Sequence, residues 1–146
     1  RMSAPQEAAG HWVTVWAASA QGAYPVGATI AQPDLSVALP DAAQGLVNQS
    51  LRMLLRPGLW SARFRLRLSN CFGDRPLQLR GLSLGLHLGG GALVPGTRVE
   101  LPDLTVPAGA SAWTPAVAWA ALPATPQLMQ GRSLAFSASG SDRLNR

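Results

Sequence analysis

The clearest pattern in the chain is an alternation of charged and apolar residues along 63–68. Successive side chains of an extended strand point to opposite faces, so Phe64, Leu66 and Leu68 would share one face and the three arginines of this run the other. A strand can hide such an apolar face only against a second layer. The pattern therefore predicts a β-sandwich or barrel.

Short apolar runs of strand length recur along the chain and are separated by glycine and proline turn signals. Within 77–88 the leucines change from odd to even positions at Arg80-Gly81, and a one-residue shift of this kind predicts a β-bulge. Residues 10–20 or 41–49 could hold one turn of helix at most. We expect strands over 11–17, 48–56, 60–69, 77–88, 97–101, 104–106, 116–119 and 133–139.

This series of short strands predicts an all-β fold, an antiparallel β-sandwich with jelly-roll-like topology. The 146 residues, 47% of them hydrophobic, suffice for one domain with its own core. We expect residues 1–10 to be a flexible lead-in, 11–140 to form the sandwich, and 141–146 to be a tail. The stretch 21–45 is too interrupted by proline and glycine for a regular element, and we expect a long surface connection there.

The charge pattern narrows the possible partners. The net charge is +5, and all 12 basic residues are arginine. Such a domain could bind nucleic acid, an anionic surface or an acidic partner. The lack of lysine in a chain rich in Ala, Gly and Pro indicates coding bias, and no nucleic-acid-binding motif is present, so nucleic-acid binding is not expected. No apolar run approaches the roughly 18 to 20 residues that span a bilayer, so no membrane span is expected.

The chain lacks the motifs of a serine hydrolase. A catalytic triad needs a serine on a tight turn, a histidine base and a carboxylate that orients it. Neither a Gly-x-Ser-x-Gly nor a Gly-Asp-Ser motif occurs. His11 and His87 are the only histidines, and we expect both to face solvent or to be capped. The single cysteine, Cys71, is expected to be a small buried apolar residue. No catalytic residue, metal site or cofactor is predicted.

Several segments nevertheless resemble a known family. The chain is similar to the N-terminal β-sandwich region of secreted bacterial SGNH/GDSL-type hydrolases, esterases whose catalytic domain follows in sequence. The core of the resemblance is QSLRMLLRPGLWSARFRLRLSN at 49–70 and FGDRPL at 72–77, which is fairly specific. Weaker matches lie at 12–21, 31–35, 92–97, 105–113 and 130–140, so the resemblance covers nearly the whole chain in order.

Three departures from the family pattern limit what can be carried over. Residues 114–117 read TPAV where the family usually shows SDPV, which removes a carboxylate, and Cys71 stands where another small or polar residue is common. The family would continue beyond Arg146 through further strands to its Gly-Asp-Ser and Asp-x-x-His motifs. The resemblance therefore implies a non-catalytic domain, secreted or periplasmic, that lacks its last strands, and its implied partner is the downstream hydrolase domain. A sandwich of this kind should leave one strand edge unpaired.

Two sets of residues are candidates for contact with substrate or with a neighbouring domain. The turn that holds Asn70, Gly73 and Asp74 could lie at the mouth of an active site. Alternatively, Asn70 and Gly73 supply left-handed turn geometry while Phe72 fills the core, which is the interpretation we prefer. Arg65 and Arg67 belong to the second set. Their row would repel itself unless acids or water screen it, and it is either a solvated face or a contact with an acidic partner surface.

Other functions also fit the sequence. A stand-alone carbohydrate-binding jelly-roll module would display a row of exposed aromatic side chains, although core packing explains most tryptophans more simply. The bound ligand would then be a carbohydrate rather than an ester. An interaction protein that recruits acidic partners is a third, weaker option. The tryptophan candidates for an aromatic row are Trp12, Trp16, Trp60, Trp113 and Trp119.

Overall fold

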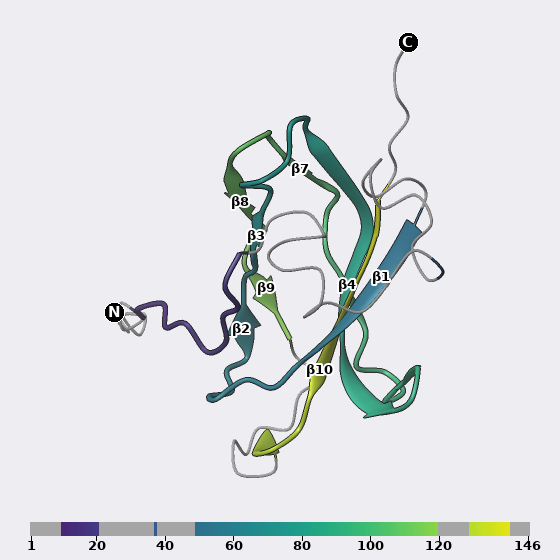
Figure 1. Cartoon of the computed structure of the whole chain (residues 1–146). Coiled ribbons are helices and arrows are strands. Elements are labelled where there is room, and N and C mark those ends of the chain that lie inside the picture. Colours follow the sequence, from purple (N-terminus) through teal and green to yellow (C-terminus); the bar gives the residue numbers. More distant parts are fainter. Residues whose placement is uncertain (1–9, 21–36, 38–48, 120–128, 141–146) are drawn as a thin grey trace, which may run out of the picture.

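The computed structural model describes residues 10–20, 37, 49–119 and 129–140. Its ten elements are all strands, paired antiparallel, and Figure 1 shows them in two layers. The all-β class and the antiparallel, sandwich-like arrangement are thus confirmed. The lead-in 1–9, most of the connection 21–45 and the tail 141–146 lie outside the described residues. In the described part of the chain, no helix has the length and hydrophobicity that a membrane crossing requires.

The larger layer is a strongly curled sheet built around one long strand. This strand, β4 (Leu77–Gly89), pairs along one edge with β10 (Leu134–Gly140), which pairs in turn with β1 (Gln49–Leu55). Three short strands follow one another along the other edge of β4: β5 (Ala92–Leu93), β6 (Val99–Glu100) and β7 (Leu104–Val106). Among the described strands β1 pairs with β10 alone, so β1 is the edge of this sheet.

The predicted β-bulge in the long strand is confirmed. Ser137 and Ser139 of β10, two residues apart, lie opposite Ser83 and Arg80 of β4, which are three residues apart. The extra residue on β4 coincides with Gly81, whose φ is +57°. A left-handed glycine in a bulge shifts the register by one residue. This shift explains why Leu79 and then Leu82, Leu84 and Leu86 are all buried on the inner face.

The smaller layer is a two-stranded ribbon with an interruption. β2 (Arg63–Phe64) pairs with β9 (Val117–Ala118), and β3 (Arg67–Ser69) pairs with β8 (Ser111–Trp113). The prediction of one continuous strand over 60–69 is therefore wrong, because this segment forms two shorter strands. Between the two halves, the Thr114 hydroxyl accepts a hydrogen bond from the Leu66 N–H at 2.9 Å in place of a backbone carbonyl.

Three aromatic rings pack together in the core, with Phe64 and Trp119 buried and Trp60 partly buried against them. Phe64 meets Trp60 and Trp119 edge to face, with ring centroids 6.2 and 5.6 Å apart. The inward alternation predicted for the ribbon strand is confirmed, because Phe64 is buried while Leu66 and Leu68 pack against the core. The larger sheet and the residue that follows β6 contribute the other large members: Leu55, Leu79, Leu82, Leu84, Leu101, Val106, Leu134 and Phe136.

Three further expectations need correction. The strand predicted over 11–17 is absent, since this segment forms no ladder and is held instead by a hydrogen bond from the Gly58 N–H to the Val15 carbonyl at 2.9 Å. Two short strands, β5 and β8, lie in stretches where the sequence predicts no strand: β5 directly follows the glycine turn 89–91, and β8 lies between the prolines at 107 and 115. The other strands lie within one or two residues of their expected bounds.

Candidate functional site

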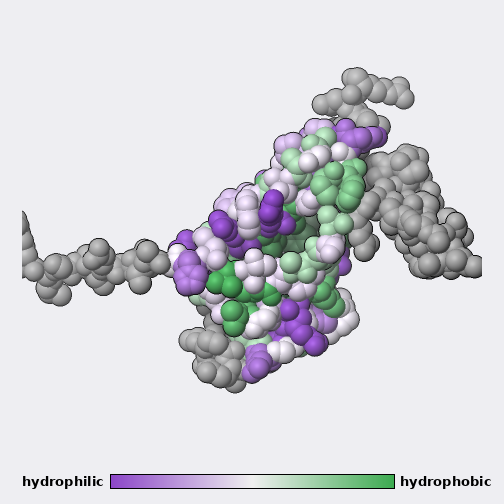
Figure 2. Space-filling view, turned by 60° about the vertical axis from the view of Figure 1, so that its left-hand side comes forward, coloured by the Kyte–Doolittle hydropathy of each residue, from purple (hydrophilic) through white to green (hydrophobic). Residues whose placement is uncertain are grey.

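The ribbon places its three arginines on the outer side of the smaller layer. Arg63 and Arg67 are exposed and Arg65 is half-buried, as the alternation of the strand predicts. Trp113 of β8 lies directly opposite Arg67 in the strand pair, and directly opposite residues share a face of the sheet. Figure 2, which turns the ribbon side forward, shows hydrophilic and hydrophobic residues interspersed there.

Two tryptophan rings interleave with the arginines. The Arg65 guanidinium carbon lies 4.3 Å from the ring centroid of Trp12 and 4.3 Å from that of Trp113. Arg63 lies 6.0 Å from the Trp12 ring and Arg67 lies 5.9 Å from the Trp113 ring. A cation within about 6 Å of an aromatic face is attracted by the ring quadrupole. We call Trp12, Arg63, Arg65, Arg67 and Trp113 the Trp–Arg face.

Contacts within the fold hold Trp12 and Arg67 of this face in place. Trp12 reaches the ribbon because Val15, three residues later, packs against the core and bonds to Gly58 through its carbonyl. Arg67 donates from Nε to the Ser111 hydroxyl at 3.0 Å. The rings offset part of the repulsion expected within an arginine row, since each guanidinium carbon lies 6.0 Å or less from the centroid of an aromatic ring.

The described carboxylates do not neutralise this face. The ion pairs recorded among the described residues join Arg75 to Asp74 and Arg98 to Glu100. None of them involves an arginine of the Trp–Arg face. The face therefore presents three positive charges and two half-exposed rings, with Trp12 45% and Trp113 50% accessible.

Asn70 joins two loops, the one that follows β3 and the one that precedes β8. Its side-chain nitrogen lies 2.8 Å from the Arg75 carbonyl and 3.2 Å from each of the Val106 and Pro107 carbonyls. The main-chain carbonyl of Asn70 accepts hydrogen bonds from the backbone N–H groups of Gly73 and Gly109, both at 3.0 Å. These bonds connect the turn 70–76 to the turn 107–110. The amide of Asn70 is thus used to hold backbone, which favours a structural role over contact with substrate.

The predictions for three residues near Asn70, namely Gly73, Phe72 and Cys71, are wrong. Gly73 is not among the glycines with positive φ; a Cβ there would instead overlap the Asn70 amide. Phe72 does not fill the core, because it sits in an exposed turn with 62% of its surface accessible. Cys71, expected to be buried, is exposed in the same turn. The turn is too short to carry two consecutive side chains back under the sheet.

Asp74 lies at the outer tip of this turn. Its side chain is 82% exposed and pairs with the adjacent Arg75, whose Nε lies 3.0 Å from the carboxylate. The hydrogen bond from Arg75, followed by its charge, lowers the pKa of Asp74 below 3.8. Asp74 and Asn70 therefore share a turn, whereas Arg65 and Arg67 belong to the Trp–Arg face.

The histidines take up no catalytic geometry in the described structure. His11 is exposed, and the Nε2 of His87 lies 3.0 Å from the Gly90 carbonyl of its own hairpin. The described residues include no group of three or more histidine, cysteine or carboxylate side chains placed to hold a metal ion.

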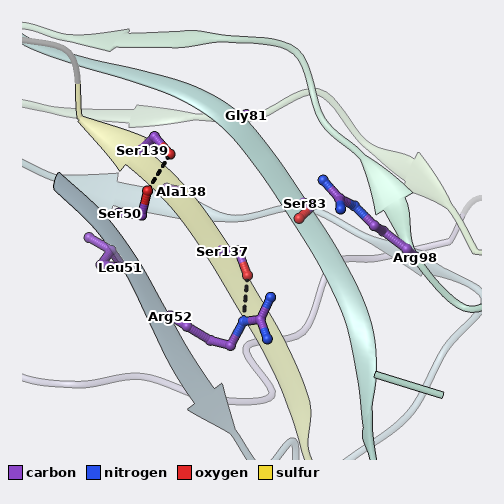
Figure 3. Close-up of a pocket in the computed structure, with 9 residues that line it drawn as sticks. All are labelled: Ser50, Leu51, Arg52, Gly81, Ser83, Arg98, Ser137, Ala138 and Ser139. Carbon is purple, nitrogen blue, oxygen red and sulfur yellow. Dashed lines mark hydrogen bonds between the residues drawn. The ribbon is translucent and has the colours of Figure 1, made fainter. Parts of the chain in front are cut away.

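A polar hollow of about 430 Å³ lies on the sheet face opposite the core. Figure 3 shows serines of β1, β4 and β10 on its floor, with Arg52 and Arg98 on either side. Ser50 and Ser139 bond to each other at 2.9 Å, and Arg52 bonds to Ser137 at 2.9 Å and to the Gly91 carbonyl. Arg98 pairs with Glu100 at 2.8 Å. These groups largely satisfy one another, and the hollow has the character of a solvated sheet face.

The sequence identified the arginines of the Trp–Arg face but not the rings that organise them. Trp12 is expected in a strand, and Trp12 and Trp113 are both candidates for an aromatic row, but nothing in the sequence places either ring beside the arginines. Of the five tryptophans, Trp60 and Trp119 belong to the core, while Trp12, Trp16 and Trp113 are the exposed ones. The sequence alone gives no signal for this arrangement, because the position of Trp113 opposite Arg67 depends on the strand register.

Comparison with known proteins adds no family. No protein-family model matches the chain, and no curated protein matches it either.

Proposed function

We propose that this chain is a non-catalytic β-domain of an SGNH/GDSL-type serine ester hydrolase. The complete protein would hydrolyse acyl esters through a serine acyl-enzyme intermediate, and this domain would brace or shape that site. A secreted or periplasmic location follows from the same resemblance. The proposal rests on residues 49–77, where the resemblance is most specific.

The single observation that carries the proposal is the use the fold makes of Asn70 and Gly73. Both belong to the specific block SN-x-FG, and both act on backbone within the domain: the Asn70 amide bonds to three carbonyls, and Gly73 leaves room for it. Asn70 and Gly73 thus hold two loops of the domain together, which is what a bracing domain needs. A substrate-binding role would leave the amide directed away from its own chain.

Two measurements test this function. The coding sequence that follows residue 146 should contain an in-frame Gly-Asp-Ser block, and its absence would refute the ester-hydrolase assignment. The purified chain should release no nitrophenol from p-nitrophenyl acetate or butyrate, while the chain produced together with that downstream segment should. Activity of the isolated chain that His11→Ala or His87→Ala abolishes would contradict a purely accessory role, because the chain would then supply a catalytic base of its own.

A carbohydrate-binding module is the second candidate, favoured by the exposed rings of Trp12, Trp16 and Trp113. Sugar binding needs an open ring face, however, and guanidinium groups already lie over Trp12 and Trp113. Titration with soluble polysaccharides, followed by tryptophan fluorescence, separates the two functions. A saturable change that Trp16→Ala abolishes would favour the module, and a flat response would exclude it for the sugars tested.

A further inference from the structure

The Trp–Arg face is organised more tightly than a solvated surface requires. Arg65 is restrained from both sides by rings 4.3 Å away, and Arg67 is fixed through Nε to the Ser111 hydroxyl. A free arginine side chain loses part of its rotamer entropy when a partner binds. Because these side chains are already restrained in the fold, that cost of binding is reduced.

The chemistry of the face points to carboxylates. Its three guanidinium groups form no ion pair with a described carboxylate, whereas Arg75 and Arg98 each pair with one. Neighbouring arginines on the same face of a strand stand roughly 6.5 to 7 Å apart, which gives a row of separate cationic sites. The planar guanidinium fork matches a carboxylate with two parallel hydrogen bonds.

We propose that the Trp–Arg face docks against a carboxylate-rich protein surface. Exposed Arg63 and Arg67 would pair with acidic side chains at the two ends, while Trp12 and Trp113 would supply the apolar contact between them. Tryptophan and arginine are the residue types that dominate the centres of protein interfaces. That the partner is the hydrolase domain rests on the function proposed above. That the partner surface is rich in carboxylates rests on the Trp–Arg face alone.

Other polyanions fit the face less well. Single-stranded nucleic acid binds by stacking bases on open aromatic faces, and the faces of Trp12 and Trp113 that meet Arg65 are occupied. A sulfated polysaccharide would need open ring faces for its sugars to stack on, and Arg65 lies over one face of each ring. An acidic protein surface uses both components of the face.

The test measures binding of a fluorescein-labelled poly-glutamate peptide by anisotropy at low ionic strength. Arg63→Glu/Arg67→Glu reverses the exposed ends of the face and should weaken binding by about tenfold or more. Arg80→Glu/Arg132→Glu is the matched control, because it changes the net charge by the same amount. Both arginines are exposed and lie outside the Trp–Arg face, Arg80 in β4 and Arg132 two residues before β10. The control should bind within about twofold of the wild type, as expected for charges outside a contact.

Several outcomes would overturn the proposal. Equal weakening in both double variants would show that only net charge matters. Tighter binding of heparin or of single-stranded DNA than of poly-glutamate, at equal charge concentration, would assign the face to another polyanion.

Thermal unfolding must show that the reversed variant is folded. If it is not, Arg63→Lys/Arg67→Lys is used, which keeps the charge but loses the fork. Binding of this variant should weaken by about threefold, because charge is retained while paired hydrogen bonds are lost, and unchanged binding would refute recognition by the guanidinium fork. Absence of a downstream Gly-Asp-Ser block would refute the hydrolase assignment without touching these results.

Discussion

The backbone of Gly73 packs directly against the side-chain amide of Asn70. A Cβ built at position 73 would overlap that amide, and all three of its nearest atoms belong to the Asn70 side chain. The same amide bonds to the carbonyls of Arg75, Val106 and Pro107. Glycine is therefore required at 73 by its neighbour's position, although its φ is not left-handed.

This contact predicts strong coupling between the two positions. Asn70→Ala should lower the free energy of unfolding by about 1 to 3 kcal/mol, because it leaves loop carbonyls without their donor. Gly73→Ala should cost about 1 to 3 kcal/mol through overlap with the amide. In the Asn70→Ala background the second substitution should cost at least about 1 kcal/mol less, since the overlapping group is gone.

Urea unfolding of the four proteins in this cycle measures the coupling. Gly91→Ala is a suitable control, because a Cβ there would meet nothing within 4 Å. Additive effects of the Asn70 and Gly73 substitutions would show that the overlap is relieved elsewhere in the loop.

The Trp–Arg face should contribute to stability mainly through its central arginine. Arg65→Gln removes a cation held 4.3 Å from two rings and should cost about 1 to 2 kcal/mol, the sum of two cation–π contacts. Arg63→Gln should cost less than about 0.5 kcal/mol, since a single ring lies near its cation at a longer distance. Chemical denaturation compares the two. Equal losses would mean that the rings do not hold Arg65.

The bulge of β4 should depend on the left-handed conformation of Gly81. Gly81→Ala places a Cβ on a residue with φ of +57° and should cost about 1 to 2 kcal/mol in stability. Gly89→Ala, in the same strand but without a positive φ or a nearby atom, should be neutral or slightly stabilising. Thermal unfolding of both variants decides the matter, and an equal shift would leave the bulge without a glycine requirement.

The two core tryptophans should respond differently to the loss of the indole N–H. Trp119 donates to the Thr97 carbonyl at 2.7 Å, whereas the buried indole nitrogen of Trp60 has no hydrogen-bond partner in the described structure. Trp119→Phe should therefore cost at least about 1 kcal/mol more than Trp60→Phe, because it alone breaks a buried hydrogen bond. Equilibrium unfolding measures both, and the reverse order would contradict the assigned hydrogen bonding.

Asp74 gives a prediction with a definite sign in pH. Its pKa is lowered in the fold by Arg75, so its contribution to stability is present above its ordinary value of 3.8 and is lost as the pH falls through the folded pKa. The difference in melting temperature between the wild type and Asp74→Asn should be small, constant from pH 7 to 5, and should vanish in more acidic solution. A difference that grows on acidification would reverse the sign.

Local periodicity accounts for the parts of the fold that the sequence predicts. The parity change of the leucines in 77–88 located the bulge at Gly81, and the alternation in 63–68 assigned Phe64 to the core and the arginines to the outside. Side chains of a strand must alternate between its faces, so a strand with one buried face has apolar residues at every second position of its sequence. Several such patterns in one chain predict the all-β class.

Pairing between distant segments decided the rest. The strand at 60–69 is interrupted because the Leu66 N–H donates its hydrogen bond to the side-chain hydroxyl of Thr114, 48 residues away, instead of to a backbone carbonyl. Segment 11–17 has the alternation of a strand, yet none of the described strands pairs with it, and Trp12 lies against Arg65 instead. Periodicity states which face a residue prefers but not which segment will cover it. The Trp–Arg face depends on strand register and on the packing of Val15, and only the tertiary structure sets those.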